Sequence, residues 1–304
     1  MDLSIVIVNW NVKDYLLQTL RSIYNNPPQA SFEVFVVDNA SSDDSVFAVK
    51  SEFQQVKIIE SKQNIGFSGA NNLALAQAMG NIILLLNPDT EVLPHSLDEL
   101  LNSFDRHPKA GLIGAQLLTP DREQDRSNKS YPSFRTLLWT ALFLDDLFPK
   151  NRIFGEYRMS YWDHQDERQV DQPSGAAMAI RKEILEKVGY MDDHYFLYCE
   201  EADWSFRIKK AGYEIWFTPS SKIIHYGGRS TRQSTRLRNK AAHRSLYRFF
   251  YKRYPFYPIL THIIVFFLEL LKFIVGFMVI GILTGILFLT LKYFKIIPKL
   301  TPFF

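Results

Sequence analysis

The sequence predicts an α/β fold, with a mostly parallel sheet flanked by helices, followed by apolar C-terminal helices that associate with a membrane. Short β-branched apolar runs alternate with segments of helical apolar spacing through roughly the first 90 residues, which is typical of a parallel sheet with right-handed crossovers. Charged residues are common up to about residue 253 and nearly vanish afterwards. We therefore expect a folded domain over residues 1–230, a basic segment over 231–256 and membrane-associated helices over 257–304.

Each element is predicted from an apolar run and the residues that end it. Short apolar runs predict buried strands at 3–8, 32–37, 56–59 and 82–86. Helical spacing predicts helices at 15–24, 42–53 and 70–79, the last ended by Gly80. Residues 121–171 lack a clear period, and we expect them to form an irregular acceptor surface or lid. Beyond them, strands are expected at 176–180, 213–218 and 223–225, and helices at 182–188 and 202–211 with Gly212 as the C-cap.

The composition limits the compartment and the function classes. The single cysteine, Cys199, allows no intramolecular disulfide, which fits a reducing cytoplasm. Met1 leads into the first strand without a basic region, so we expect no secretory signal. The sequence contains no P-loop and no dinucleotide-binding glycine fingerprint, which argues against kinases and dehydrogenases.

Polar side chains follow three of the predicted strands at the point where each strand ends. Asn9 and Asn11 follow the first strand, Asp38 and Asn39 the second, and Asp89 the fourth. Ligands of open α/β sheets bind beyond the carboxyl ends of the strands. We therefore expect these side chains to lie together and form a binding site.

The turn Asn87-Pro88-Asp89 opens a loop directly after a buried strand. A carboxylate at this place can hold Mg²⁺ or Mn²⁺, because such ions favour oxygen ligands and bridge proteins to phosphates. A turn without a metal explains the same three residues, so this motif alone leaves both interpretations open.

Glu200, Glu201 and Asp203 form an acidic cluster at a predicted loop-to-helix junction. A helix N-terminus stabilises negative charge, so the cluster can be a solvated helix cap. The aromatic residues around it would instead exclude water and raise the pKa of one carboxyl toward that of a useful base. Further along, His225 ends a strand and is followed by two glycines and Arg229. Imidazole binds metals and Arg suits phosphate, although a lone histidine is more often an ordinary polar residue.

Taken together, these clusters and the motifs around them resemble the family 2 glycosyltransferases of the GT-A fold, especially the rhamnosyltransferase-like branch that builds bacterial cell-surface polysaccharides. The matching segments fall in family order over roughly residues 3 to 230. Besides the acidic cluster, they are IVIVNWN at 5–11, VVDNASSD at 36–43, NIGFSGANN at 64–72, LNPDT at 86–90, SGAA at 174–177 and HYGG at 225–228.

The resemblance implies a role for each candidate residue. Contacts to the nucleotide sugar would come from Asn9, Asn11, Asp38, Asn71, Asn87, Gly175 and Arg229, with Asp38 bound to the pyrimidine base. Asp89 would bind Mg²⁺ or Mn²⁺, and His225 would complete the metal or diphosphate site. The family's catalytic Asp is replaced by Glu201, whose extra methylene moves the carboxylate by about 1 Å. We expect Glu201 to be the base, with Glu200 and Asp203 as alternatives.

The implied reaction is an inverting transfer of a sugar from a nucleotide-diphosphate donor, with dTDP-rhamnose as the expected donor, to a lipid-linked or cell-surface glycan. A polyprenyl-phosphate glycosyltransferase is an alternative. Its phosphate acceptor needs little base catalysis, so loss of Glu201 should lower its activity less. A nucleotidyltransferase that makes the sugar nucleotide is a second alternative. An inactive membrane scaffold with a glycosyltransferase-like domain is the non-enzymatic alternative, which the Glu201 replacement leaves open.

The C-terminal segment predicts attachment to a membrane. Nine Lys or Arg and no Asp or Glu occur between residues 229 and 253, which fits a basic belt facing anionic lipids better than a nucleic-acid site. Residues 273–291 are uncharged and long enough to span a bilayer. Basic residues flank the apolar segment on both sides, which favours a hairpin, a re-entrant pair or an in-plane helix at the cytoplasmic face. Gly281 and Gly285 permit helix packing between copies of the chain.

Overall fold

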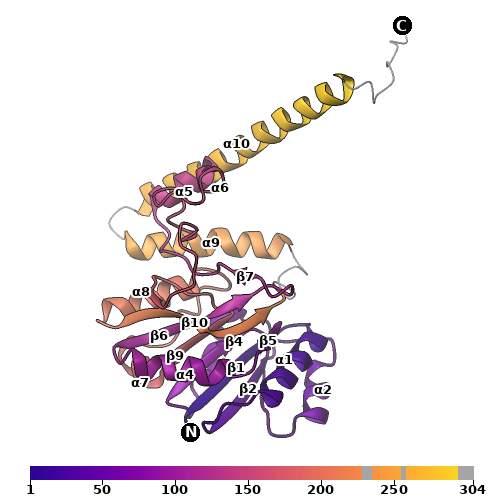
Figure 1. The fold of residues 1–304 in the computed structure, drawn as a ribbon, viewed down its shortest axis with the longest axis vertical. Coiled ribbons are helices and arrows are strands. Elements are labelled where there is room, and N and C mark those ends of the chain that lie inside the picture. The colour runs from indigo at the N-terminus through magenta and orange to yellow at the C-terminus, as the bar shows by residue number, and fades with distance from the viewer. Residues whose placement is uncertain (228–234, 255–257, 294–304) are drawn as a thin grey trace.

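One mixed sheet forms the centre of the domain (Figure 1). The computed structural model describes residues 1–227, 235–254 and 258–293. The strands are β1 (Leu3–Asn9), β2 (Phe32–Asp38), β3 (Lys57–Glu60), β4 (Ile82–Leu86), β5 (Thr90–Val92), β6 (Ala110–Leu118), β7 (Gln124–Asp125), β8 (Arg168–Gln169), β9 (Ala177–Arg181) and β10 (Glu214–His225). Their order is β3-β2-β1-β4-β9-β6-β10-β5, with β7 beside β6 and β8 beside β10.

The direction of β9 determines which loops reach the ligand edge of the sheet. Strands β1 to β4 are parallel to their neighbours in this group, whereas β9 runs antiparallel to both β4 and β6. The amino end of β9 therefore lies at the edge where β1, β2 and β4 end. This places the loop that contains Gly175 at the predicted binding edge.

Helices cover both faces of the sheet and bury its apolar side chains. One core contains side chains of α1 (Lys13–Asn25), α2 (Ser45–Glu52) and α4 (Ser96–Arg106). The other core contains side chains of α3 (Gly66–Leu75), α7 (Lys182–Val188) and α8 (Glu200–Lys210). The strands read as continuous apolar runs because both of their faces are covered, so the predicted α/β architecture is confirmed.

A third apolar cluster joins the domain to its C-terminal helices. These are α9 (Thr235–Arg253) and α10 (Pro258–Tyr293), and α5 (Phe134–Ala141) with the short α6 (Leu144–Leu147) lies against α10 (Figure 1). The cluster contains Tyr195 and Ala202 from the acidic region, Phe249 and Phe250 from α9, and Val265 from α10. The acidic region is thus packed directly on the C-terminal helices.

Several predicted boundaries are wrong for identifiable reasons. Helix α3 begins at Gly66 instead of residue 70 and ends at Leu75, because its two glycines, which lower helix propensity, lie in its first turn. The two strands expected at 213–218 and 223–225 form the single strand β10, whose register shifts between Thr218 and Lys222, around Pro219. Residues 121–171 contain helices α5 and α6 and are not wholly irregular. Gly212 has a φ of +90° directly after α8 and its C-cap residue, which confirms a glycine at this helix end.

The sequence favoured a hairpin of membrane helices, but the described residues do not form one. Helix α10 continues without a break from Pro258 to Tyr293 and projects away from the domain (Figure 1). Apolar residues on both sides of Lys272 simply extend one helix, because no proline or turn motif interrupts them. Lys295 and Lys299 lie outside the described residues, and so do the surroundings of Gly281 and Gly285.

Candidate functional site

The ends of β1 and β2 form the first part of the site. The Asn9 amide donates hydrogen bonds to Asp38 Oδ1 at 3.1 Å and to Ser41 Oγ at 3.0 Å. The backbone N–H of Ser41 donates to Asp38 Oδ2 at 3.0 Å. Asn9 and Asp38 are buried, and Asn9 Oδ1 accepts no hydrogen bond from the described residues. Within the described ranges, Asn9 Oδ1 is therefore an unpaired acceptor buried at this edge of the sheet, and contact of Asn9 with the nucleotide stays a prediction.

Two further asparagines hold the loops that follow these strands. Asn11, at a φ of +53°, accepts a hydrogen bond from the backbone N–H of Ser42 at 2.7 Å. Asn39 donates to Asn64 and accepts from the backbone N–H of Ile65 at 2.9 Å, and so joins the end of β2 to the start of α3. The sequence marked Asn39 as a strand-end residue, but its partners are distant in the chain and were not predicted.

Asn87, Asp89 and His225 meet between the β4–β5 turn and the end of β10. His225 Nε2 lies 3.4 Å from Asp89 Oδ1 and 3.4 Å from the Asn87 amide nitrogen. The turn is fixed by Thr19 of α1, whose hydroxyl accepts from the backbone N–H of Thr90 at 3.1 Å and lies 2.8 Å from the carbonyl oxygen of Pro88. Thr19 was not predicted to support this turn, because no local motif indicates a contact so far along the chain.

The Asp89–His225 pair fits a divalent cation. Two neighbouring ligands of an octahedral ion, each at about 2.1 Å from it, lie roughly 3 Å apart, close to the distance observed between Oδ1 and Nε2. Both side chains are largely buried, and a carboxylate oxygen with an imidazole nitrogen suits Mn²⁺ better than Mg²⁺, which prefers oxygen ligands alone. Asn87 adds a neutral group where a second carboxylate would add charge.

Gly175 lies beside these residues. The backbone N–H of Asn87 donates to the carbonyl oxygen of Ala176 at 2.9 Å, which fixes the loop before β9 against the Asn87 turn. A Cβ atom at Gly175 would approach the ring of Phe67 to 3.6 Å. The loop therefore lies between the Asn87–Asp89 turn and α3, and contact of Gly175 with the donor stays a prediction.

Helix α3 is connected to the acidic region through backbone atoms. Gly66 has a φ of +78°, and a Cβ atom there would lie 2.4 Å from the carbonyl oxygen of Phe196. That oxygen accepts a hydrogen bond from the N–H of Phe67 at 2.8 Å. Asn72, which sequence reasoning did not single out, clamps Met191 by donating to its carbonyl oxygen and accepting from its N–H.

Asn71 is buried next to this clamp. Its amide donates to the carbonyl oxygen of Phe67 within the same helix at 2.9 Å. The structure therefore shows a contact that supports the helix, and the role of Asn71 in closing the donor site stays a prediction. Arg229, the remaining predicted donor contact, lies outside the described residues.

At the start of α8, Glu200 is buried and Glu201 is partly buried. Burial raises the pKa of Glu201, an effect that the charge of Lys129 partly offsets. Burial and the charge of Glu201 raise the pKa of Glu200 well above its usual range. Oε2 of each side chain has no hydrogen-bond partner among the described residues. The cluster is therefore not a solvated cap, and it provides a carboxylate poised to accept a proton.

The backbone before these residues is strained. Cys199 and the residue before it, Tyr198, have φ values of +62° and +71°. Left-handed conformations of non-glycine residues cost about 1 kcal/mol or more each and concentrate at functional sites. Sequence reasoning did not predict this strain, because neither Tyr nor Cys is typical of left-handed positions.

Asp203 makes a different set of contacts. Its Oδ2 accepts from Arg207 at 2.9 Å, and its Oδ1 lies 2.5 Å from Lys252 of α9. Two cations therefore occupy both carboxylate oxygens. This arrangement suits a structural anion better than a general base, so of the three candidates Glu201 and Glu200 are the ones left with a free oxygen.

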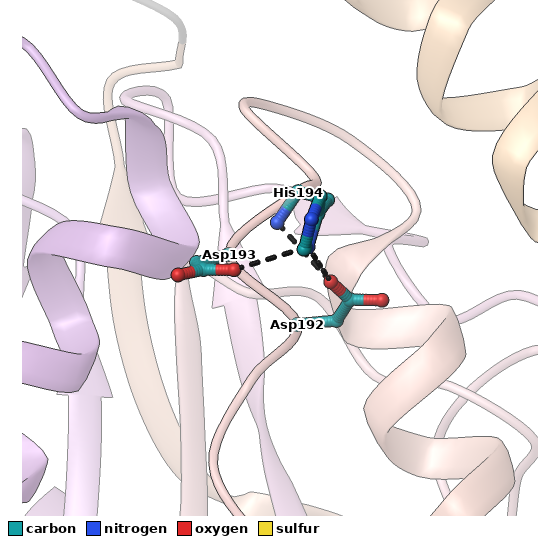
Figure 2. A group of neighbouring side chains, drawn as sticks. All are labelled: Asp192, Asp193 and His194. Carbon is teal, nitrogen blue, oxygen red and sulfur yellow. Dashed lines mark hydrogen bonds and ion pairs between the residues drawn. The ribbon is translucent and has the colours of Figure 1, made fainter.

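Asp192, which lies beside Asp193 and His194 (Figure 2), links the loop before α8 to α9. Its carboxylate pairs with Arg248 at 2.9 Å and Lys252 at 3.0 Å. Burial alone would raise the pKa of Asp192, but hydrogen bonds from these two cations hold it well below its usual range. Asp192, Asp193 and His194 have ligand atoms within 4.8 Å of one another, yet the two cations already neutralise Asp192. We interpret this group as an ion-pair cluster, and Asp89 and His225 stay the predicted metal ligands.

The family of the chain follows from comparison with known proteins. A family model described as glycosyl transferase family 2 matches residues 4–189. The chain belongs to this family. The match ends before the acidic cluster and His225, so the roles of these residues rest on the geometry given above and on the resemblance.

Curated relatives of this glycosyltransferase are similar over most of its length. An N-acetylglucosaminyl-diphospho-decaprenol L-rhamnosyltransferase of Mycobacterium tuberculosis is 27% identical over 263 residues, covering 83% of this chain and 85% of that protein. The rhamnosyltransferase WbbL of Escherichia coli is 25% identical over 237 residues, covering 75% and 84%. Among solved structures, a mannosyltransferase of Pyrobaculum calidifontis with GDP-Man and Mn²⁺ superposes with a TM-score of 0.56 at 18% identity, covering 89% of this chain and 70% of that one. This last likeness concerns the fold.

Proposed function

We propose that this glycosyltransferase is a metal-dependent, inverting rhamnosyltransferase that uses dTDP-rhamnose and a lipid-linked saccharide acceptor at the cytoplasmic face of a membrane. The observation that carries the proposal is the meeting of Asp89 and His225 at the edge where Asn9 and Asp38 also lie. The names of the two rhamnosyltransferase relatives support the sugar, and the decaprenol in one of them supports the lipid-linked acceptor.

The residues divide the reaction between binding and proton transfer. A divalent ion held by Asp89 and His225 would supply positive charge beside the donor diphosphate. Asn9, with its free buried oxygen, and the loop held by Asp38 bind the nucleotide. Glu201 takes the proton of the acceptor hydroxyl, whose oxygen attacks the anomeric carbon. The bond from that carbon to the diphosphate oxygen breaks as the new bond forms on the opposite face, so the configuration inverts.

The proposed attachment to the membrane rests on α10. Its segment Ile259–Met278 is long and apolar enough to cross a bilayer, and only 11% of its most apolar window is buried against the protein. Phe266, Phe273 and Phe277 are each more than half exposed. An apolar surface of this size rarely faces water in a monomeric protein, which supports lipid contact.

The proposal is tested by release of nucleoside diphosphate. We would incubate the detergent-solubilised protein with Mg²⁺ or Mn²⁺, a panel of nucleotide sugars and a lipid extract. We expect release from dTDP-rhamnose, dependence on the metal, and loss in Asp89→Ala and Glu201→Gln. Asp193→Ala is the matched control, because Asp193 is an exposed carboxylate of the Asp192 group.

Other outcomes would identify the alternatives. Activity that survives in Glu201→Gln would move the base to Glu200 or indicate a polyprenyl-phosphate acceptor. Diphosphate release from a nucleoside triphosphate would indicate a nucleotidyltransferase. Failure of the protein to bind any donor would favour an inactive scaffold. Loss of metal dependence in Asp193→Ala would relocate the metal to the Asp192 group.

A further inference from the structure

The turn after α6 exposes apolar and basic side chains together. Leu147 is 67% exposed, Phe148 52% and Ile153 56%. Lys150 and Arg152 lie between them in the chain and are also exposed. Neither forms a salt bridge with another residue in the part of the chain that the structure describes. We call residues 147–153 the α6 tip.

Arg158 offsets one of the two negative charges near the α6 tip, and residues 147–153 themselves contain no Asp or Glu. Asp145 and Asp146 both pair with Arg158, at 3.3 and 2.7 Å. The tip itself therefore presents net positive charge from Lys150 and Arg152, combined with a large aromatic and aliphatic surface. This combination suits the boundary between anionic headgroups and acyl chains.

The position of the α6 tip is fixed by α10. Phe143, which directly precedes α6, lies against Gly276, since a Cβ atom on that glycine would approach the Phe143 ring to 3.4 Å. Gly276 belongs to the apolar segment Ile259–Met278. Helix α5 also packs along α10 (Figure 1). Lipid that surrounds this part of α10 must therefore meet α5, α6 and the tip as well.

The two faces of α10 agree with this arrangement. Thr261 and Val265 are buried against the protein, whereas Ile259, Phe266 and Phe273 on the other face are exposed. The exposed face of α10 is therefore free to contact lipid, while α5 and Phe143 pack on the same helix.

We propose that the α6 tip is a second membrane-contacting element, which inserts Leu147, Phe148 and Ile153 at the bilayer interface while Lys150 and Arg152 bind lipid phosphates. The inference rests on the proposed membrane attachment and deepens it. The partner is an anionic bilayer, because the positive charge of the tip is complementary to it and because α5 and Phe143, next to the tip, pack on the apolar segment of α10. A symmetric contact between the tips of two copies of this chain would lack this charge complementarity, because both tips carry the same cations.

The test reads contact with lipid directly and does not depend on activity. The full chain with Phe148→Cys, Phe273→Cys or Phe47→Cys is labelled with an environment-sensitive fluorophore and reconstituted into phosphatidylcholine vesicles with or without phosphatidylglycerol. Lipid-borne quenchers then report which label touches the bilayer. Phe47 is the control, because it is 75% exposed on α2, in the half of the domain away from α10 (Figure 1). Unsubstituted protein gives the background, since burial raises the pKa of the Cys199 thiol and slows its labelling.

We expect quenching at positions 148 and 273 and none at 47. The ratio of inserted to free tip should rise roughly thirtyfold with anionic lipid, because each Lys or Arg near such a surface contributes about fivefold, and Lys150→Glu with Arg152→Glu should abolish that rise. Quenching at 273 without quenching at 148 would overturn this inference alone. Absence of quenching at 273 would overturn the membrane attachment and the inference with it. A fluorescence change at 148 that grows with protein concentration in detergent would instead assign the tip to a contact between copies.

Discussion

At the scale of single residues, the carboxyl pair Glu200–Glu201 and the cation Lys129 decide how the acidic cluster behaves. Burial raises the pKa of Glu201, and Lys129 lowers it. A base with a raised pKa is deprotonated only when the pH exceeds that pKa, but its deprotonated form then binds a proton more strongly. The cluster thus operates closer to neutral pH than an exposed Glu would.

The pH dependence of the rate tests this account. In the wild type we expect kcat/KM to rise with pH through a limb that lies above the ordinary Glu pKa of about 4.3. Lys129→Met removes the compensating cation, so the pKa of Glu201 should rise further and the limb should move to higher pH. Glu201→Gln should abolish the limb and lower the rate by about 10²–10⁴-fold. A limb unchanged in Glu201→Gln would assign it to another group.

Gly66 offers a second test at this scale, through its close approach to Phe196. Gly66→Ala places a Cβ atom where the carbonyl oxygen of Phe196 now lies and forces a left-handed φ, which costs about 1–2 kcal/mol before any clash. We expect a lower Tm and a reduced kcat, because the displaced loop leads to Glu201. The control is Gly69→Ala in the same helix, whose Cβ meets Ile65 only at 3.4 Å. An equal loss in both variants would show that helix α3, and not the contact to Phe196, is responsible.

At the scale of elements, α9 holds in place the loop before α8, which contains Asp192 and Leu197. Arg248 and Lys252 hold Asp192, Lys252 also holds Asp203, and Ser245 donates to the carbonyl oxygen of Leu197 at 2.8 Å. A further hydrogen bond joins His243 of α9 to Glu269 of α10. The loop that leads to the proposed base is therefore held by α9, which is itself hydrogen-bonded to α10, the helix proposed to contact the membrane.

Removing ion pairs between α9 and the acidic residues around Glu201 should lower kcat more than it raises the KM for the donor. We expect Lys252→Met to lower kcat while the KM for the nucleotide sugar changes little, because Asn9 and Asp38 lie on other elements. Lys252→Arg should restore most of the rate. Steady-state kinetics with each variant make the comparison. A rise in the donor KM equal to the fall in kcat/KM would instead place α9 in donor binding.

The ion pairs of Asp192 with α9 have a predictable effect on the free energy of unfolding. Asp192 is held well below its usual pKa, so its contribution is present above the unfolded-state pKa of about 3.9 and is lost as pH falls toward the lower folded-state value. Asp192→Asn should therefore lower the free energy of unfolding at pH 7 by about 1–2 kcal/mol, a figure reduced for the partial exposure of both cations. Urea denaturation at pH 7 and near pH 3 should show this difference shrinking. A constant difference would contradict the assignment.

The sequence predicted the elements of the nucleotide half better than those of the acceptor half. Strands such as β1 and β4 are buried on both faces, and their apolar runs show this locally. The Asp89–His225 meeting also follows from motif order. The orientation of β9, the Thr19 support and the Asn72 clamp depend on partners far away in the chain, and α5 owes its packing to α10. No local pattern reports such contacts.

At the scale of the whole molecule, the exposed face of α10 is expected to control membrane recovery. Phe266→Glu with Phe273→Glu places two charges on that face, where both side chains are more than half exposed. We expect the protein to shift from the membrane fraction to the soluble fraction with little change in Tm, since these side chains make few contacts within the domain. Phe47→Glu, on α2, is the matched control and should stay with the membrane. Equal behaviour of the two variants would remove α10 as the attachment.

The backbone pairing between Lys129 and Gln172 has a consequence for how such enzymes diversify. The N–H of each residue donates to the carbonyl oxygen of the other, at 3.0 and 3.1 Å. The segment between them therefore starts and ends at one hydrogen-bonded pair. Chain closed at its base costs only about 0.6 kcal/mol more for each doubling of its length. Within that segment, residues 131–156 add no strand to the sheet and no side chain to its two cores, whereas β8, Met159 and Trp162 do. We therefore expect relatives to differ in length and sequence at 131–156, while the sheet, the Asp89–His225 pair and Lys129 stay in place.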